Sequence, residues 1–504
     1  MITTIFHNLA TLDVFSSLMI GVIAGLVIGA LPGLSGNMAL ALLLPITYTM
    51  KAESAIIMML AIYTASMTGG SISACLLHTP GTPSNAATAI DGYPMTLRGE
   101  GIKALSISIT SSMIGGTLSA VALLIIAPPL AKVSLMFSEP ENFLLAIFGL
   151  TVIGSLAGDD MVKGLLMAAA GLLLATVGID NITGMHRFTF GSLRLLSGVQ
   201  LVPTMIGLFS IPRVLSICEK PKEANKSLVM DKGTKLSGSV FLKKSEYMRI
   251  LPVILLSSIV GIFVGILPGA GGSIGSWLAY DNAKKMSKHK EEFGHGSIEG
   301  LAAVESGNNA VTGGAFIPLL TLSIPGSPAA AIVLGALMIH GLVPGNRLFT
   351  QQAETTYTIL VGFLLANLVM GIIGLIFARW AVYITRIPNS ILLPCVLVLS
   401  FIGAYAINAT MFDVWTAIFF GVLGYIMEKN NLPAAPLILG LILGGDAESG
   451  LRLSMVMARG SLLKYFMGRT PCVILMVIIL ISLLYPIITG LIKKRKERGG
   501  LNAC

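Results

Sequence analysis

One short sequence occurs twice in the chain, and both copies interrupt an apolar run. The Leu-Pro-Gly at 31–33 recurs at 267–269, an offset of 236 positions (267 minus 31). Proline has no backbone N–H and glycine tolerates a positive φ, so a helix is expected to break at each copy. In hydrocarbon, a broken helix leaves polar backbone groups that are costly unless they are satisfied. Each break is therefore expected where protein covers it, or where it lines a cavity that holds water, ions or substrate.

A second pair of related stretches follows in the same order. The Thr-Gly-Gly at 68–70 recurs at 312–314, and the Pro-Gly at 80–81 recurs at 325–326. Landmarks that keep their order and nearly keep their offset indicate an internal repeat of about half the chain. Gly/Pro-interrupted segments at corresponding places in two apolar halves point to the binding site of a transporter.

The low content of charged residues places these repeats in a membrane. Of 504 residues, 54% are hydrophobic and 11% are charged, whereas soluble domains carry about 25% charged residues. Such a chain cannot cover a globular surface with charge. Its net charge of +9 comes largely from two basic segments, which indicates membrane topology and no nucleic-acid partner. The five cysteines form no Cys-x-x-Cys pair, so neither a zinc site nor a disulfide framework is indicated.

These features predict an all-α polytopic membrane protein with roughly 10 to 13 membrane elements, since a span needs about 20 apolar residues. Basic segments should be cytoplasmic, and no Lys or Arg precedes Lys51. If Arg249 and Lys284 are both cytoplasmic, the apolar stretch between them enters the membrane and returns. We therefore expect two inverted repeats, each with a re-entrant hairpin and a broken helix. The expected parts are a first membrane repeat (1–218), a cytoplasmic linker (219–248), a second membrane repeat (249–492) and a basic cytoplasmic tail (493–504).

The breaks carry small, neutral, hydrogen-bonding residues. A broken helix offers N–H groups to an anion and C=O groups to a cation such as Na⁺. An anionic substrate would then be held without a fixed ion pair, which favours release. The candidate substrate- and cation-binding residues are Pro32, Gly33, Leu34, Ser35, Asn37, Ser71, Pro80, Gly81, Thr82, Ser84, Pro268, Gly269, Gly271, Ser273, Asn308, Asn309, Thr312, Pro325, Gly326 and Ser327.

Four polar residues need separate interpretations. Asn308 and Asn309 are the most specific candidates, because two adjacent amides in an apolar run are expensive unless they are engaged. Glu305 is a possible proton or cation site within the membrane, and its alternative is a helix-end carboxylate near the interface. Asp91 is expected in a turn. No other metal site and no cofactor is expected.

Several motifs in one order resemble the large membrane subunit of the bacterial tripartite tricarboxylate transporters. They lie at 30–34, 69–71, 80–82, 91–95, 187–191, 267–271, 279–280, 293–296, 305–310, 313–318 and 324–326. The resemblance implies a secondary transporter, not an enzyme, that takes up a carboxylate such as citrate by alternating access, coupled to a cation. It also implies a multi-pass protein of the bacterial inner membrane with a small membrane subunit and an extracytoplasmic solute-binding protein as partners. Ser323 and the Ser-Gly at 306–307 depart from the family pattern beside the expected site, which leaves the substrate open.

Two other functions fit parts of the sequence. Ser35 lies in a Gly-x-Ser-Gly context and could be the nucleophile of an intramembrane serine protease, with His78 or His340 as base. The corresponding second turn, at 269–272, has no serine, so a duplicated binding site explains the repeat better. A channel is the other alternative, because the same broken helices could line a continuous pore.

Overall fold

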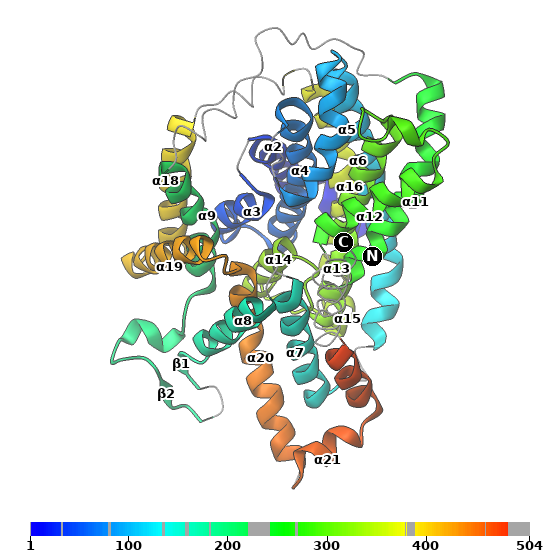
Figure 1. Ribbon diagram of the computed structural model, residues 1–504. Coiled ribbons are helices and arrows are strands. Elements are labelled where there is room, and N and C mark those ends of the chain that lie inside the picture. Colours follow the sequence, from blue (N-terminus) through cyan, green and yellow to red (C-terminus); the bar gives the residue numbers. More distant parts are fainter. Residues whose placement is uncertain are drawn as a thin grey trace, which may run out of the picture. The chain divides into compact units, whose positions relative to one another are not determined.

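The computed structural model (Figure 1) describes residues 2–31, 34–78, 82–133, 137–156, 161–180, 183–219, 242–267, 271–378, 380, 389–458 and 460–481. Helices dominate these ranges. The strands described there are β1 (Gly178–Ile179) and β2 (His186–Arg187), which pair antiparallel with Gly178 opposite Arg187. The predicted all-α class is confirmed.

Eight of the described helices are long and apolar enough to cross a membrane. They are α2 (Leu12–Ala30), α4 (Ala52–Leu77), α6 (Gly101–Val133), α9 (Leu201–Glu219), α11 (Lys244–Ile266), α16 (Ala353–Phe377), α19 (Met411–Lys429) and α20 (Ala434–Ala458). The other described α-helices are α1 (Ile2–Ala10), α3 (Gly36–Thr47), α5 (Ala86–Leu97), α7 (Glu139–Leu156), α8 (Met161–Ala175), α12 (Gly271–Met286), α13 (Ile298–Leu322), α14 (Pro328–Ile339), α15 (Asn346–Thr350), α18 (Asn389–Asn408), α21 (Leu462–Met467) and an apolar helix at Thr470–Ile481. Short 3₁₀ turns are η1 (Pro83–Asn85), η3 (Leu193–Ser197) and η4 (Lys290–Glu292). The chain is therefore a multi-pass membrane protein.

The chain divides into two compact units, and each is built from two separate segments. The first unit comprises Met1–Ala131 and Val202–Tyr425, and the second comprises Lys132–Leu201 and Ile426–Cys504. In the second unit α20 packs on α7 and α8. The β hairpin is tied to α20 by ion pairs, Arg187 with Glu448 at 2.6 Å and Arg452 with Asp180 at 2.8 Å. All the predicted site residues belong to the first unit.

The first unit contains two similar series of helices. The series α2, α3, α4, α5 and α6 corresponds in order to α11, α12, α13, α14 and α16, and the short helix α15 is an addition in the second series. Leu31 and Leu267 end α2 and α11 in the same extended conformation, each with its N–H bonded to the carbonyl three residues earlier. His78 and Ser323 end α4 and α13 in the left-handed region, with φ of 54° and 59°. The two halves therefore break at equivalent places.

Glycines let the paired helices of each half approach closely. A Cβ added to Gly29 of α2 would lie 2.4 Å from Ser66 O of α4, and one added to Gly265 of α11 would lie 2.6 Å from Val311 O of α13. Gly25 and Gly261, one turn earlier, face the same partner helices. Small residues spaced four apart are the usual means of close packing between membrane helices. The helices α4 and α13 are consequently buried along almost their whole length.

The two halves contact each other near their breaks. The turn η1, which follows the break of α4, contacts α12, and α14, which follows the break of α13, contacts α3. The helix α13 also contacts α4 and α5. The segment after each of these breaks therefore meets α12 or α3 of the other half, and this junction holds most of the predicted site residues.

Candidate functional site

Serine side chains cap the helices that start at the breaks. Ser35 Oγ accepts a hydrogen bond from Met38 N of α3 at 3.3 Å, and Ser327 Oγ accepts one from Ala330 N of α14 at 3.2 Å. Ser327 Oγ also lies 3.0 Å from Tyr63 Oη of α4. The contact of Ser35 is that of an N-cap, not of a nucleophile held by a base, so the geometry gives no support to the serine protease alternative.

Asn308 is a fully buried amide without a hydrogen-bond partner among the described residues. Its side chain is 0% exposed, and neither Oδ1 nor Nδ2 has a partner. It points to the place where the halves meet: a Cβ added to Gly272 of α12 would lie 2.5 Å from Asn308 Oδ1 and 3.1 Å from Ser84 Cβ. A buried amide left unsatisfied costs about 1–3 kcal/mol. Such an amide marks a position that a ligand or water would complete.

Asn309, its neighbour, takes part in hydrogen bonds between helices. Its Nδ2 donates to Thr68 Oγ1 of α4 at 2.8 Å. Thr64 Oγ1 lies 3.4 Å from Asn309 Oδ1 but only 2.6 Å from Asn367 Oδ1 of α16, and its single proton serves the shorter contact. Asn309 therefore joins α13 to α4, and its contacts are those of a structural residue.

Glu305 lies inside α13 and is 0% exposed. Three hydroxyl groups from three other helices donate to its carboxylate. Ser71 Oγ of α4 and Ser112 Oγ of α6 donate to Oε2 at 2.7 and 2.9 Å, and Thr88 Oγ1 of α5 donates to Oε1. Glu305 is therefore not a helix-end carboxylate.

The turn η1 carries a polar cluster next to Asn308. Thr82 Oγ1 lies 2.7 Å from Ser84 Oγ and also contacts Asn85 Oδ1. Asn85 Nδ2 donates to Ser71 Oγ at 2.8 Å and to Met67 O at 3.1 Å. The sequence analysis identified Thr82, Ser84 and Ser71 but missed Asn85, although an amide beside the Pro-Gly break was a usable signal.

The remaining predicted residues separate into four groups. Leu34 is 2% exposed and packs in an apolar cluster with Met38 and Val214, so it is a core residue. Thr312 Oγ1 donates to Asn309 O within its own helix. Five residues have no assigned ligand role: the half-buried Asn37, Gly271 and Ser273 and the buried Pro325 and Gly326. Six residues lie outside the described ranges: Pro32, Gly33, Pro80, Gly81, Pro268 and Gly269.

Asp91 is not in a turn, as the sequence suggested, but in the middle of α5. Its Oδ1 accepts backbone hydrogen bonds from Gly294, Gly296 and Ser297, each at 2.9 Å. These residues lie in the loop between α12 and α13. Asp91 therefore fixes the loop of the second half to a helix of the first, because one oxygen satisfies three backbone N–H groups.

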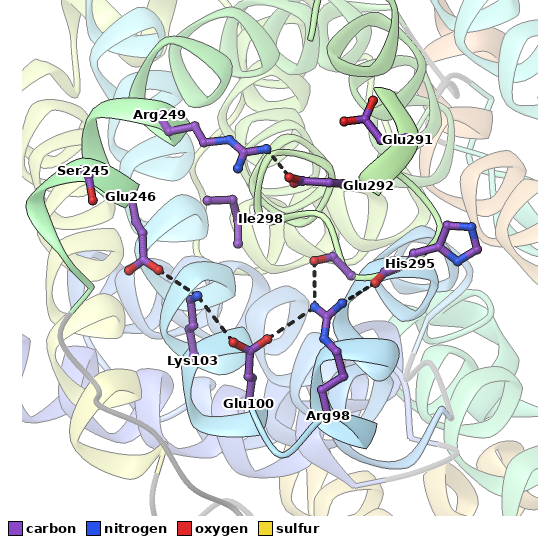
Figure 2. Close-up of a pocket in the computed structure, with 11 residues that line it drawn as sticks. Arg98, Glu100, Lys103, Ser245, Glu246, Arg249, Glu291, Glu292, His295 and Ile298 are labelled. Carbon is purple, nitrogen blue, oxygen red and sulfur yellow. Dashed lines mark hydrogen bonds and ion pairs between the residues drawn. The ribbon is translucent and has the colours of Figure 1, made fainter. Parts of the chain in front are cut away.

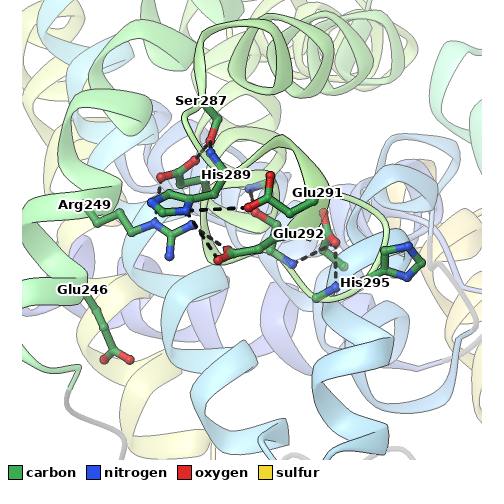
Figure 3. A network of polar contacts seen from close by, with 12 residues as sticks. Glu246, Arg249, Ser287, His289, Glu291, Glu292 and His295 are labelled. Carbon is green, nitrogen blue, oxygen red and sulfur yellow. Dashed lines mark hydrogen bonds and ion pairs between the residues drawn. The ribbon is translucent and has the colours of Figure 1, made fainter.

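A charged cleft of about 870 Å³ lies beside this loop (Figure 2). Its walls pair with one another: Lys103 Nζ lies 2.7 Å from Glu246, and Arg98 donates to the carbonyl of His295 at 2.7 Å. Arg249, which also lines the cleft, pairs with Glu292 at 2.6 Å (Figure 3). It also pairs with Glu299 at 2.7 Å. These charged groups are already paired with one another. The unpartnered amide of Asn308 is therefore the better candidate for binding a ligand. Within the described ranges, no group of three His, Cys, Asp or Glu residues is arranged to hold a metal ion.

Comparison with known proteins assigns the family. The profile of the tripartite tricarboxylate transporter TctA family matches residues 15–439. A 52.8 kDa protein of the TAR-I ttuC' 3' region of Agrobacterium vitis is 38% identical over 447 residues, which cover 88% of each chain. A protein of the TAR-II ttuC' 3' region of the same organism is 40% identical over 201 residues, which cover 40% of this chain and 83% of the relative. No solved structure matches. The chain therefore belongs to the tripartite tricarboxylate transporter TctA family, a family of transporter subunits and not of enzymes.

Proposed function

We propose that this chain is the large membrane subunit of a transporter that takes up a carboxylate such as citrate together with Na⁺, by alternating access. Its partners would be a small membrane subunit and an extracytoplasmic solute-binding protein, in a bacterial inner membrane with the C-terminus cytoplasmic. The family membership supports the class of protein. The single observation that supports the site is the buried amide of Asn308, unpartnered among the described residues, at the junction of α12 and η1.

The chemistry of this junction suits an anion that binds with a cation. Asn308 Nδ2 and Ser84 Oγ can donate to a carboxylate, and the first turn of α12 contributes backbone N–H groups and a favourable dipole. Asn308 Oδ1 is an oxygen ligand of the kind that Na⁺ takes, and broken helices in other transporters supply further oxygen ligands from their backbone carbonyls. None of the candidates around Asn308 carries a permanent charge, so the cation would balance the substrate.

Ion pairs support the hairpins in this proposal. Lys51, which precedes α4, lies 3.1 Å from Asp13 at the start of α2. In the second half Arg249, near the start of α11, binds Glu292 and Glu299 beside the start of α13. In both halves the chain therefore returns to the end from which it started, as a re-entrant hairpin requires. The inversion of the two repeats is part of the proposal and is tested below.

Uptake into proteoliposomes tests the proposal. The vesicles would contain this chain and its small subunit, with the binding protein outside, and would receive radiolabelled citrate or other di- and tricarboxylates with and without a Na⁺ gradient. Saturable, Na⁺-dependent uptake of one acid is the expected result. Uptake driven by a proton gradient alone would overturn Na⁺ coupling. Uptake that never saturates would favour a channel, and no uptake with a loaded binding protein would overturn the proposal.

A further inference from the structure

A continuous line of hydrogen bonds connects the proposed site to the buried carboxylate of Glu305. Ser84 and Thr82 of the break contact each other, and Thr82 contacts Asn85. Asn85 donates to Ser71, and Ser71 donates to Glu305. Asn85, Ser71 and Glu305 are each 0% exposed. The line starts next to Asn308 and ends inside α13.

Donor counting gives this line a direction. Asn85 Nδ2 is an amide nitrogen and can only donate, so Ser71 Oγ accepts from it. The one proton of Ser71 is then free for Glu305 Oε2 at 2.7 Å or for Met67 O at 3.3 Å, and the shorter contact is to the carboxylate. Ser112 and Thr88 also direct protons to Glu305. The carboxylate is thus the common acceptor at the end of the line.

The same arrangement argues against Glu305 as a direct cation ligand. Three hydroxyl protons from α4, α5 and α6 point at its two oxygens. A cation at those oxygens would face these protons and would have to displace them. Glu305 is better placed to fix the groups that surround it than to bind the transported ion.

We propose that Glu305 is a positioning residue of the transport site, which acts through Ser71 and Asn85 to hold the 82–85 segment in the conformation that receives the substrate. The effect on transport rests on the proposed function. The effect on the segment does not, because it follows from the contacts alone. Without the line, part of the binding free energy would be used to order the segment each time substrate binds, and the apparent affinity for substrate would fall.

Ser71 and Ser112 provide a matched pair of variants. Both are fully buried serines that donate to the same carboxylate oxygen, but only Ser71 also contacts Asn85. Ser71→Ala cuts the line and Ser112→Ala leaves it intact. Asn85→Ala cuts the same line at its other contact. If one line is involved, the double variant Ser71→Ala/Asn85→Ala should be no worse than the more affected single variant.

Hydrogen–deuterium exchange of the full chain in nanodiscs, without substrate, is the first measurement. We expect the amides of residues 84–88 to exchange about tenfold faster in Ser71→Ala and Asn85→Ala, since local opening controls exchange. Ser112→Ala and the unaltered chain should agree there. Equal exchange in all four proteins, or equal acceleration in Ser71→Ala and Ser112→Ala, would overturn the proposal whatever the protein transports.

Citrate uptake in the reconstituted three-component system is the second measurement. Ser71→Ala should raise the half-saturation concentration about tenfold, which corresponds to 1.4 kcal/mol, with the maximal rate within about twofold. Ser112→Ala should change the half-saturation concentration by less than about twofold, because this variant leaves the line of hydrogen bonds intact. A lower maximal rate at unchanged half-saturation in Ser71→Ala would overturn the positioning role. If the unaltered chain takes up no citrate, the proposed function fails for this acid, while the exchange result still decides whether the line of hydrogen bonds holds the 82–85 segment.

Discussion

Two adjacent asparagines in α13 have opposite environments. Asn309 donates to Thr68 and lies against Thr64, whereas the amide of Asn308 has no partner among the described residues. In a buried helix a hydrogen-bonded amide stabilises the fold, while an amide without a partner destabilises it until a ligand binds. The two residues therefore differ in what their removal should change.

Asn308→Ala should remove substrate binding and leave the fold at least as stable as before. The variant deletes an unpaired buried amide, so the thermal midpoint of the purified chain should stay constant or rise, while citrate uptake falls at least about tenfold, the equivalent of one good hydrogen bond to a charged group. Asn309→Ala is the matched control and should lose about 1–3 kcal/mol of stability, because it leaves Thr68 without its donor. A drop in stability for Asn308→Ala with normal uptake would contradict the assignment.

Gly272 tests the space around the same amide. A Cβ at Gly272 would lie 2.5 Å from Asn308 Oδ1, so Gly272→Ala should fill the junction and abolish saturable uptake while helix α12 remains. Gly445→Ala is the control, since a Cβ there would meet nothing within 4 Å, and Ala is favoured over Gly in a helix by up to about 1 kcal/mol. Binding of labelled citrate to detergent-solubilised protein checks both variants. Unchanged binding in Gly272→Ala would place the site elsewhere.

The sequence revealed part of this site at the level of residues. It identified Asn308, Ser84, Ser71 and Glu305 because polar groups in apolar runs are expensive. It could not separate Asn308 from Asn309, since which amide finds a partner depends on residues more than 230 positions away. For the same reason, nothing local showed that Ser112 of α6 would reach Glu305.

At the scale of elements, α2 and α11 end at the predicted Leu-Pro-Gly stretches, whereas α4 and α13 end earlier than the predicted Pro-Gly pairs. The caps of α4 and α13 are His78 and Ser323, two residues before the proline. Proline disfavours the helical conformation of the residue before it, so the helix must end earlier. The left-handed φ of 54° and 59° at these two residues is uncommon for residues other than glycine. The same uncommon backbone conformation at His78 and Ser323 indicates that the two breaks are equivalent features of the two halves.

The close helix pairs give a prediction about stability. Gly29→Ala and Gly265→Ala would place a Cβ 2.4 Å and 2.6 Å from a backbone oxygen of the partner helix. Backbone cannot move aside as a side chain can, so each variant should lose about 1–3 kcal/mol from overpacking. Thermal unfolding in detergent, with Gly445→Ala as the reference, measures the loss. Midpoints equal to that reference would mean that the helices are less tightly packed than the distances indicate.

At the scale of the whole molecule, composition and repeated motifs were sufficient for class and family. A charged content of 11% required a membrane protein, and the family profile confirms the resemblance over residues 15–439. The division into two units, each made of two separate segments, had no counterpart in any local pattern. Such a division depends on which helices pack together over long range, and hydropathy along the chain does not contain that information.

The inversion of the two repeats makes the last prediction. The start of α11 follows the lysine-rich segment that we expect to be cytoplasmic, whereas the start of α2 has only Lys51 nearby, paired with Asp13. Equivalent helices with opposite charge environments should begin on opposite sides of the membrane. In a cysteine-free background, Leu12→Cys and Lys244→Cys are suitable probes because both side chains are exposed. A membrane-impermeant maleimide added to whole cells should label Leu12→Cys and not Lys244→Cys, while both should react after permeabilisation. Labelling of both from outside, or of neither, would mean that the two halves are oriented in parallel, and a central site made by opposed hairpins would then have to be abandoned.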